Sequence, residues 1–221
     1  MRLLAVASLI AVPVSLYMAF LYAPTEAFMG DVQRIMYVHV ASAETAYLAL
    51  FFVFAASIAY LRSRRPHWDA LAVAGAEVGV LFTTATLATG SIWARQVWGW
   101  WWTWDPRLTT TLVLWMLYVV YLLVRRGIDD PDRRARFAAV LGILAFADVP
   151  IVHLSVTWWR SIHPPSIAPG GTELHPDMSI ALMVAMVAFT LLGALLVWMR
   201  YRLEWLLRVL ERVRAARLDA V

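Results

Sequence analysis

Six long apolar stretches constrain the fold of this sequence more than any other feature. A helix needs about 20 predominantly apolar residues to cross the hydrocarbon core of a bilayer. The stretches that reach this length lie at 3–22, 35–61, 70–92, 108–124, 137–156 and 178–199. Only 15% of the 221 residues are charged, against about a quarter in a typical soluble domain. The sequence therefore predicts an all-α membrane protein with six transmembrane helices, which form one integral-membrane domain over 1–221.

Two of these stretches have special features. The fifth contains Asp148 and Pro150, so we expect a kink there. The first follows Arg2 and ends near Ala23, a pattern that a secretory signal peptide can also show, but its length favours a retained helix.

Arginine positions predict the orientation, because cytoplasmic segments of membrane proteins are enriched in basic residues. One side holds Arg2, Arg62, Arg64, Arg65, Arg125, Arg126, Arg133, Arg134, Arg136, Arg200, Arg202, Arg208, Arg212, Arg214 and Arg217. The other side holds Arg34, Arg95, Arg107 and Arg160. We therefore expect both termini in the cytoplasm. The basic tail, 200–221, mixes Leu, Trp and Val with Arg and Glu, which predicts a short amphipathic helix resting on the anionic inner leaflet.

Half of the 12 tryptophans fall within a short outer segment, 93–107. They are Trp93, Trp98, Trp100, Trp101, Trp102 and Trp104. If this segment is helical, Trp98, Trp101, Trp102 and Asp105 share one face. Such a surface suits a large, flat, apolar ligand, and the alternative is an ordinary aromatic belt at the membrane interface. Asp105 before Pro106 also fits the start of the fourth helix, as N-cap and first helical residue.

Histidine is the best transition-metal ligand available, because the chain contains no cysteine. His67 falls in a cytoplasmic loop, whereas the other four lie on the tryptophan side, at His39, His153, His163 and His175. Their spacing is not the compact one of a zinc site. Two imidazoles that face a flat aromatic slot fit bis-imidazole haem better. The outer Arg34, Arg95, Arg107 and Arg160 could pair with haem propionates, or could simply be hydrated at the headgroup level.

The tryptophan segment also resembles a known signature. The run Trp98-Gly-Trp-Trp-Trp-Thr-Trp-Asp105-Pro-Arg107-Leu-Thr109 is similar to the "WWD" motif of haem-handling proteins, which include the C and F components of cytochrome c maturation. The short chain, the segment Arg34-Ile-Met-Tyr-Val-His39-Val, and the pattern from Pro150 to His163 resemble the C-component family in particular.

This resemblance implies a haem-binding subunit of the bacterial cytoplasmic (inner) membrane. His39 and His163 would be the axial ligands of a non-covalently carried haem b, held on the platform of six tryptophans and Asp105. The haem would be presented at the outer face for transfer to a haem chaperone (CcmE-like). The implied partners are the two subunits of an ABC transporter module (CcmA-like, CcmB-like) and a small one-helix subunit (CcmD-like). No ATPase or other enzyme activity is expected, and the chain has no nucleotide-binding loop.

Other interpretations stay open at this point. A b-type electron-transfer subunit would also bind haem, and a structural membrane scaffold would need only an aromatic belt. Glu44, Glu77 and Asp148 lie within expected spans and do not match the family pattern. We expect these carboxylates to turn inward to hydrogen-bond partners, and we assign no ligand role to His153.

Overall fold

The computed structural model describes residues 1–163 and 174–218, and the regular elements in these ranges are helices. They are α1 (Arg2–Tyr17), η1 (Met18–Tyr22), η2 (Asp31–Arg34), α2 (Ile35–Ser63), α3 (Pro66–Trp98), α4 (Pro106–Arg126), α5 (Pro131–Phe146), α6 (Asp148–Trp158) and α7 (Pro176–Leu218). Six segments are long and apolar enough to cross a membrane: Arg2–Tyr22, Asp31–Ser63, Pro66–Trp98, Pro106–Arg126, Pro131–Trp158 and Pro176–Glu211. The predicted all-α membrane fold with six long helices is therefore confirmed. Residues 164–173 of the third outer segment and 219–221 of the tail lie outside the described residues.

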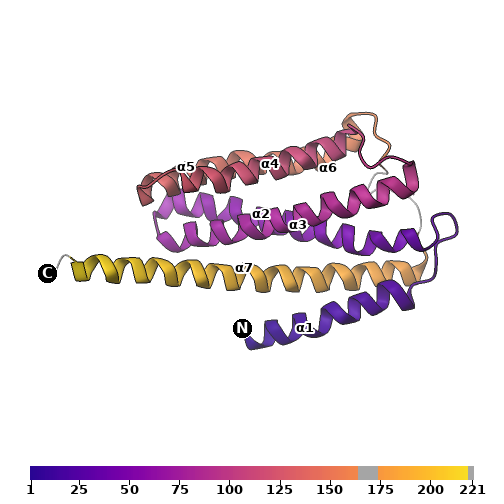
Figure 1. Cartoon of the computed structure of the whole chain (residues 1–221), viewed down its shortest axis with the longest axis horizontal. Coiled ribbons are helices and arrows are strands. Elements are labelled where there is room, and N and C mark those ends of the chain that lie inside the picture. The colour runs from indigo at the N-terminus through magenta and orange to yellow at the C-terminus, as the bar shows by residue number, and fades with distance from the viewer. Residues whose placement is uncertain (164–173, 219–221) are drawn as a thin grey trace.

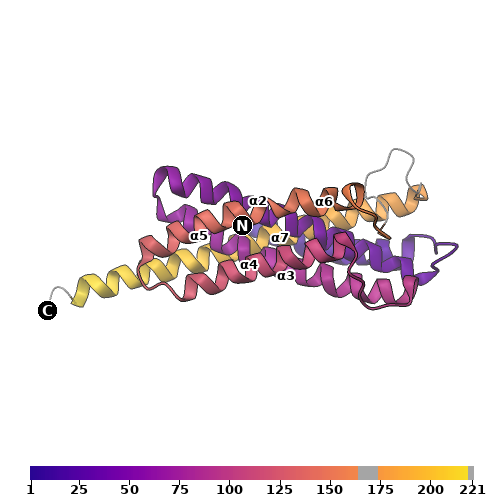
Figure 2. The same cartoon turned by 90° about the horizontal axis from the view of Figure 1, so that it is seen from above.

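Successive spans run in opposite directions along one bundle (Figures 1 and 2). The connections 23–34 and 99–105 meet at one end, together with the described residues 159–163 and 174–175, and we call it the tryptophan end. The connections 64–65 and 127–130 lie at the other end, toward which α7 runs, and we call it the arginine end. Arg34, Arg95, Arg107 and Arg160 lie in or next to the connections of the tryptophan end, whereas the predicted cytoplasmic arginines lie toward the arginine end, with Arg2 partway along the bundle at the start of α1.

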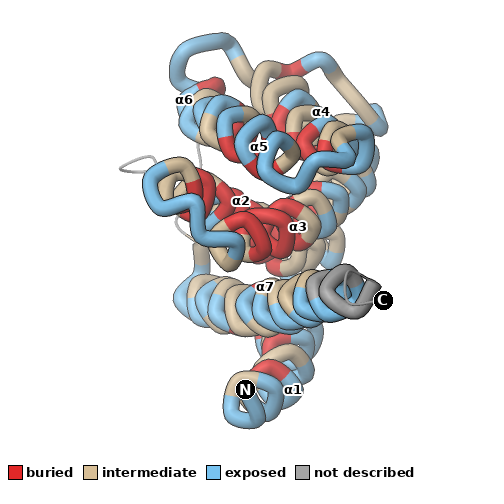
Figure 3. The backbone as a smooth tube through the Cα atoms, turned by 90° about the vertical axis from the view of Figure 1, so that its left-hand side faces the viewer, coloured by how far each residue is buried: buried red, intermediate tan, exposed pale blue. Residues whose placement is uncertain are grey.

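The helices are arranged in layers around α2 and α3, where the buried residues concentrate (Figure 3). α4, α5 and α6 cover one side of this central pair, α7 covers the other, and α1 packs on the outside of α7. Large apolar side chains on the outer helices are exposed, as expected of surfaces that contact lipid.

Glycines on one face of α3 allow a close approach of α2. Gly75, Gly79 and Gly90 are 4 and 11 residues apart, which places them on the same side of a helix with 3.6 residues per turn. A Cβ atom at Gly75 would lie 3.1 Å from Cγ2 of Val53, and one at Gly79 would overlap Leu50. Small residues at such contacts let helices pack by van der Waals interaction where lipid removes the hydrophobic drive for association.

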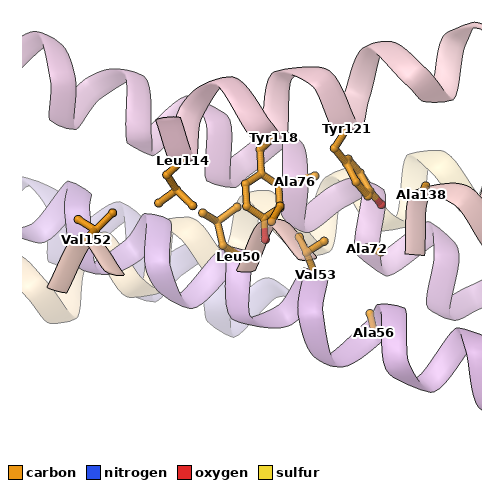
Figure 4. Packing of buried hydrophobic residues seen from close by; sticks show 11 residues of the cluster. Leu50, Val53, Ala56, Ala72, Ala76, Leu114, Tyr118, Tyr121, Ala138 and Val152 are labelled. Carbon is orange, nitrogen blue, oxygen red and sulfur yellow. The ribbon is translucent and has the colours of Figure 1, made fainter. Parts of the chain in front are cut away.

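The main core cluster lies between α2, α3, α4, α5 and α6 (Figure 4). Leu114, Tyr118 and Tyr121 of α4 point toward Leu50 and Val53 of α2, and all five side chains are fully buried. The Tyr118 hydroxyl donates to a backbone carbonyl of α5 over 3.4 Å. Its single polar group is therefore satisfied within the bundle, as a low-dielectric core requires.

Ion pairs join three helices at the arginine end. The carboxylate of Asp69 in α3, whose side chain is 5% exposed, accepts hydrogen bonds from both terminal nitrogens of Arg125 in α4, at 2.7 and 2.8 Å. It also accepts one from Arg208 in α7 at 2.7 Å. Glu77, one of the unmatched carboxylates, accepts two hydrogen bonds from Arg200 of α7. This pairing explains how Glu77 is tolerated within an apolar helix.

The predicted separate tail helix is not found, because α7 continues without a break through 43 residues to Leu218. At 1.5 Å per residue it is about 65 Å long. It runs along the bundle and its last turns project beyond the arginine end, instead of lying across that end (Figures 1 and 2). Its ion pairs with Asp69 and Glu77 hold the part after Arg200 parallel to α3. The prediction that the tail is helical is confirmed, but the sequence could not show that its arginines pair with carboxylates of α3.

The fifth span divides into α5 and α6 at Ala147, next to Asp148. Asp148 is buried, and among the described residues its Oδ2 has no hydrogen-bond partner; the same holds for Oε2 of Glu44. Both carboxylates thus turn inward, as predicted. The hydrogen-bond partners that we also expected are not found for these two oxygen atoms among the described residues.

Substituting Gly79 tests the contact between α2 and α3. Gly79→Val should lower the free energy of unfolding in detergent by about 1–3 kcal/mol, because the added methyl groups would overlap Leu50. Gly127→Val is the matched control, since the nearest atom to a Cβ at this position is a carbonyl oxygen 3.8 Å away. Equal stability of the two variants in thermal or denaturant unfolding would contradict this packing.

Candidate functional site

The tryptophan segment is not one continuous helix. α3 ends at Trp98 because Gly99 adopts the left-handed conformation, with φ of +81°, which favours glycine. Residues 99–105 are non-helical, and the side chain of Arg95 donates to the Gly99 carbonyl. The shared helical face considered for Trp98, Trp101, Trp102 and Asp105 is therefore not present in the structure.

Three of the six indoles of this segment are nevertheless exposed. The exposed fractions are 69% for Trp100, 60% for Trp101 and 76% for Trp104. Trp102 is half-buried and packs edge-on against Trp104, with ring centroids 5.8 Å apart. Trp158 and Trp159, which precede His163, are also exposed. The tryptophan end thus presents an apolar aromatic surface that the described part of the chain leaves exposed.

His39 of α2 is held against the last turns of α3. Its ring meets that of Trp93 edge-on, with centroids 5.8 Å apart. Its Nδ1 lies 3.1 Å from the hydroxyl oxygen of Thr89. A Cβ atom at Gly90 would lie 2.9 Å from Cε1 of His39, so the imidazole occupies space that a glycine leaves open. Three residues within one turn and a half of α3 therefore fix the position of this ring.

His163 reaches the same end of α3 from the segment that follows α6. Its ring lies edge-on to Trp98, with centroids 6.3 Å apart, and its Nδ1 is 3.4 Å from Nη1 of Arg107. Trp93 and Trp98 are five residues apart, about 7.5 Å along the helix axis. Both predicted histidines therefore contact an indole in the last turns of α3.

Asp105 connects the two sequence segments that build this site. One carboxylate oxygen accepts from the backbone N–H of Arg107 at 3.0 Å and caps α4, as predicted. The other accepts from the backbone N–H of Ile162 at 2.9 Å. A buried carboxylate therefore ties the start of α4 to the residue next to His163.

The four outer arginines differ in their contacts. Arg107 lies in the site, because Nη1 is near His163 and Nη2 donates to the carbonyl of His153 at 3.4 Å. Arg34 binds the turn after α1, where it donates to the carbonyls of Ala19 and Ala23 and to two side chains. Arg95 bonds Gly99, and Arg160 is exposed. Only Arg107 contacts a predicted ligand.

The remaining histidines lie elsewhere. His153 is exposed, with its ring 6.3 Å from that of Tyr47. His175 is 3.6 Å from the carboxylate of Asp177, and His67 stacks near Trp68 at the arginine end. None of these contacts brings a third imidazole to His39 and His163.

Two imidazoles fit a metal whose other ligands come from a cofactor and not from the protein. Among the residues that the structure describes, no group of three His, Asp or Glu side chains could hold an ion alone. Haem iron needs only two axial ligands from the protein, because the porphyrin supplies four. Two imidazoles beside exposed indoles and one guanidinium meet that need, and the indoles can cover the apolar macrocycle.

Thr89 and Gly90 were not singled out in the sequence analysis, although both touch His39. The available signal was their position one turn before Trp93, on the same helical face. The role of Ile162 could not be predicted either, because this residue acts through its backbone N–H and not through its side chain.

Comparison with known proteins shows the family to which the chain belongs. The sequence model of the family described as "Heme exporter protein C" matches residues 1–216. The chain therefore belongs to the Heme exporter protein C family. Heme exporter protein C of Bradyrhizobium diazoefficiens is 37% identical over 220 residues, which cover 97% of this chain and 83% of that protein. Heme exporter protein C of Escherichia coli is 34% identical over 199 residues, 90% of this chain and 81% of its own. A ccmC-like mitochondrial protein of Marchantia polymorpha, named for cytochrome c biosynthesis, is 31% identical over 176 residues, 79% of this chain and 75% of that protein.

Two aspartates with the same local motif allow helix capping to be tested separately from a contribution to the candidate site. Asp105 and Asp130 both precede proline and cap a helix, at opposite ends of the bundle. Each substitution by alanine should cost about 1 kcal/mol of stability for the lost cap. Only Asp105→Ala should also weaken haem binding, because it releases Ile162 and with it His163. Haem titration of both purified variants measures this difference, and equal affinities would contradict the link to His163.

Proposed function

We propose that this protein binds haem at its tryptophan end, with His39 and His163 as axial ligands, and presents it for cytochrome c maturation. The observation that carries this proposal is that each of the two imidazoles contacts an indole in the last turns of α3, beside other indoles that remain exposed. Membership of the Heme exporter protein C family supports haem as the ligand.

Binding would depend on three kinds of contact. The imidazoles coordinate the iron, and the tryptophans of 93–104 cover the apolar macrocycle. Arg107, whose guanidinium already lies beside His163, pairs with a propionate, since guanidinium and carboxylate groups form strong charge-assisted hydrogen bonds. Haem b would be carried as non-covalent cargo, so the protein would be a carrier without an enzymatic step of its own.

The tryptophan end would face the outside of the bacterial cytoplasmic membrane. The ends of the bundle differ strongly in arginine content, and the richer end is expected in the cytoplasm together with both termini. The haem would then be held on the periplasmic side, with one edge of the macrocycle open to a haem chaperone. We further propose an ABC module and a small one-helix subunit as partners in the complex, which release the loaded chaperone.

A b-type electron-transfer subunit is the second candidate, since it too would use paired imidazoles. Such subunits normally place both axial histidines within transmembrane helices, whereas His163 lies in a non-helical segment after α6. Among the described residues, His67 is the histidine at the arginine end, and its ring contacts that of Trp68 at the start of α3. A single histidine there does not provide the axial pair of a second haem. Rapid reduction of the bound haem by quinol would favour this alternative.

Substitution of the two proposed ligands tests the haem site. His39→Ala and His163→Ala should each abolish the bis-imidazole absorbance spectrum of the haem-loaded protein, because six-coordinate iron needs both rings. Added imidazole should restore the spectrum in part. The measurement is haem content and Soret absorbance of protein purified in detergent.

Two matched variants accompany this experiment. Glu44→Ala removes a polar side chain five residues farther along α2, and His67→Ala removes an imidazole at the other end of the bundle. Both should keep most of the haem. Equal haem retention in His39→Ala and Glu44→Ala would refute the ligand assignment.

A further inference from the structure

The hydroxyl of Thr89 has one hydrogen, and its position in α3 determines where that hydrogen goes. Oγ1 lies 2.7 Å from the carbonyl oxygen of Ala85 and 3.3 Å from that of Thr86. A carbonyl can only accept a hydrogen bond. The Thr89 hydrogen is therefore directed to the helix backbone, and the lone pairs of Oγ1 face away from it.

His39 lies on that open side. Its Nδ1 is 3.1 Å from Oγ1 of Thr89, and since the hydroxyl hydrogen is already engaged, the imidazole must be the donor. Nδ1 of His39 therefore carries a hydrogen. In a neutral imidazole only one nitrogen is protonated, so Nε2 keeps a free lone pair. This is the tautomer that a metal ligand needs.

The backbone of α3 fixes the orientation of the same ring. A Cβ atom at Gly90 would lie 2.9 Å from Cε1 and 3.4 Å from Nδ1 of His39. Trp93, one turn farther on, meets the ring edge-on. The imidazole can therefore keep its hydrogen bond to Thr89 only while position 90 has no side chain.

His163 shows the opposite arrangement. A guanidinium can only donate, so in the contact of 3.4 Å with Arg107 the Nδ1 atom of His163 is the acceptor. The proton of a neutral His163 ring would then be on Nε2. His39 is thus prepared to bind through Nε2 without a proton shift, whereas His163 is not.

We infer that Thr89 is a positioning residue: it holds His39 in the tautomer whose Nε2 can bind a metal, and Gly90 leaves the space that the ring of His39 needs. This inference rests on the proposed function, because it assumes that His39 binds iron. Partners of the second ring nitrogen commonly fix the tautomer of a metal-binding histidine and raise its basicity, and their loss typically weakens metal binding about 10- to 100-fold.

Thr89→Val removes the hydroxyl and keeps the shape of the side chain. The full-length protein in detergent, titrated with haem, should bind about 10- to 100-fold more weakly after this change. Thr89→Ser keeps the hydroxyl and should stay close to wild type. Gly90→Ala should also weaken binding although Thr89 is intact. Thr83→Val is the matched control, because the Thr83 hydroxyl makes the same bond to the carbonyl four residues earlier, farther along α3 from the site.

The midpoint potential of the bound haem gives a readout that a loss of folding would not move. A hydrogen bond from Nδ1 makes imidazole a stronger donor to iron and favours the ferric state. Haem that remains bound to Thr89→Val should therefore have a higher midpoint potential than in wild type, Thr89→Ser and Thr83→Val. Spectroelectrochemistry of the four proteins measures it.

The possible failures can be told apart. If His39→Ala loses haem while Thr89→Val matches wild type in affinity and potential, the inference about Thr89 is wrong and the proposed function stands. If Thr83→Val is weakened as much as Thr89→Val, the effect comes from α3 in general, which also overturns the inference. Full haem binding by His39→Ala would overturn the ligand assignment and the role of Thr89 with it.

Discussion

The rest of the structure depends on the close contact between α2 and α3. In a bilayer, helices gain little from excluding lipid, so association requires surfaces that approach closely. Gly75, Gly79 and Gly90 provide this on α3, and each lies against a larger residue of α2. The last of these contacts holds His39. The helix packing that stabilises the bundle is thus continuous with the contact that places the proposed haem ligand.

The two sides of the site are built in different ways. His39 belongs to a long helix and is fixed by three residues of α3. His163 belongs to a non-helical segment, and the carboxylate of Asp105 holds its neighbour Ile162. One proposed ligand therefore lies on a long helix, and the other lies in the described part of a non-helical connection, next to a residue that Asp105 holds. Such unequal support would suit the proposed role, in which haem must be held and then given up.

Hydropathy was sufficient to predict six long helices, because an apolar chain in lipid must satisfy its backbone hydrogen bonds internally. The capping role of Asp105 also followed from its place before Pro106. The helical geometry of 98–105 was wrong because Gly99 ends α3, and a glycine can equally be tolerated within a helix. The position of Thr89 and Gly90 one turn before Trp93 was visible in the sequence, but their contact with His39 was not, since it arises from the register of α2 against α3. Similarly, nothing in the sequence near Arg34 shows that its partners are carbonyls of the preceding turn.

The unbroken length of α7 has a mechanical consequence. Its distal part is bound through Arg200 and Arg208 to the first turns of α3, and its first turn contributes Met178 to the cluster against which Trp93 packs. A helix without a hinge transmits displacement along its axis instead of absorbing it. A push on the arginine end of this helix would therefore arrive about 60 Å away, next to Trp93, the indole that contacts His39.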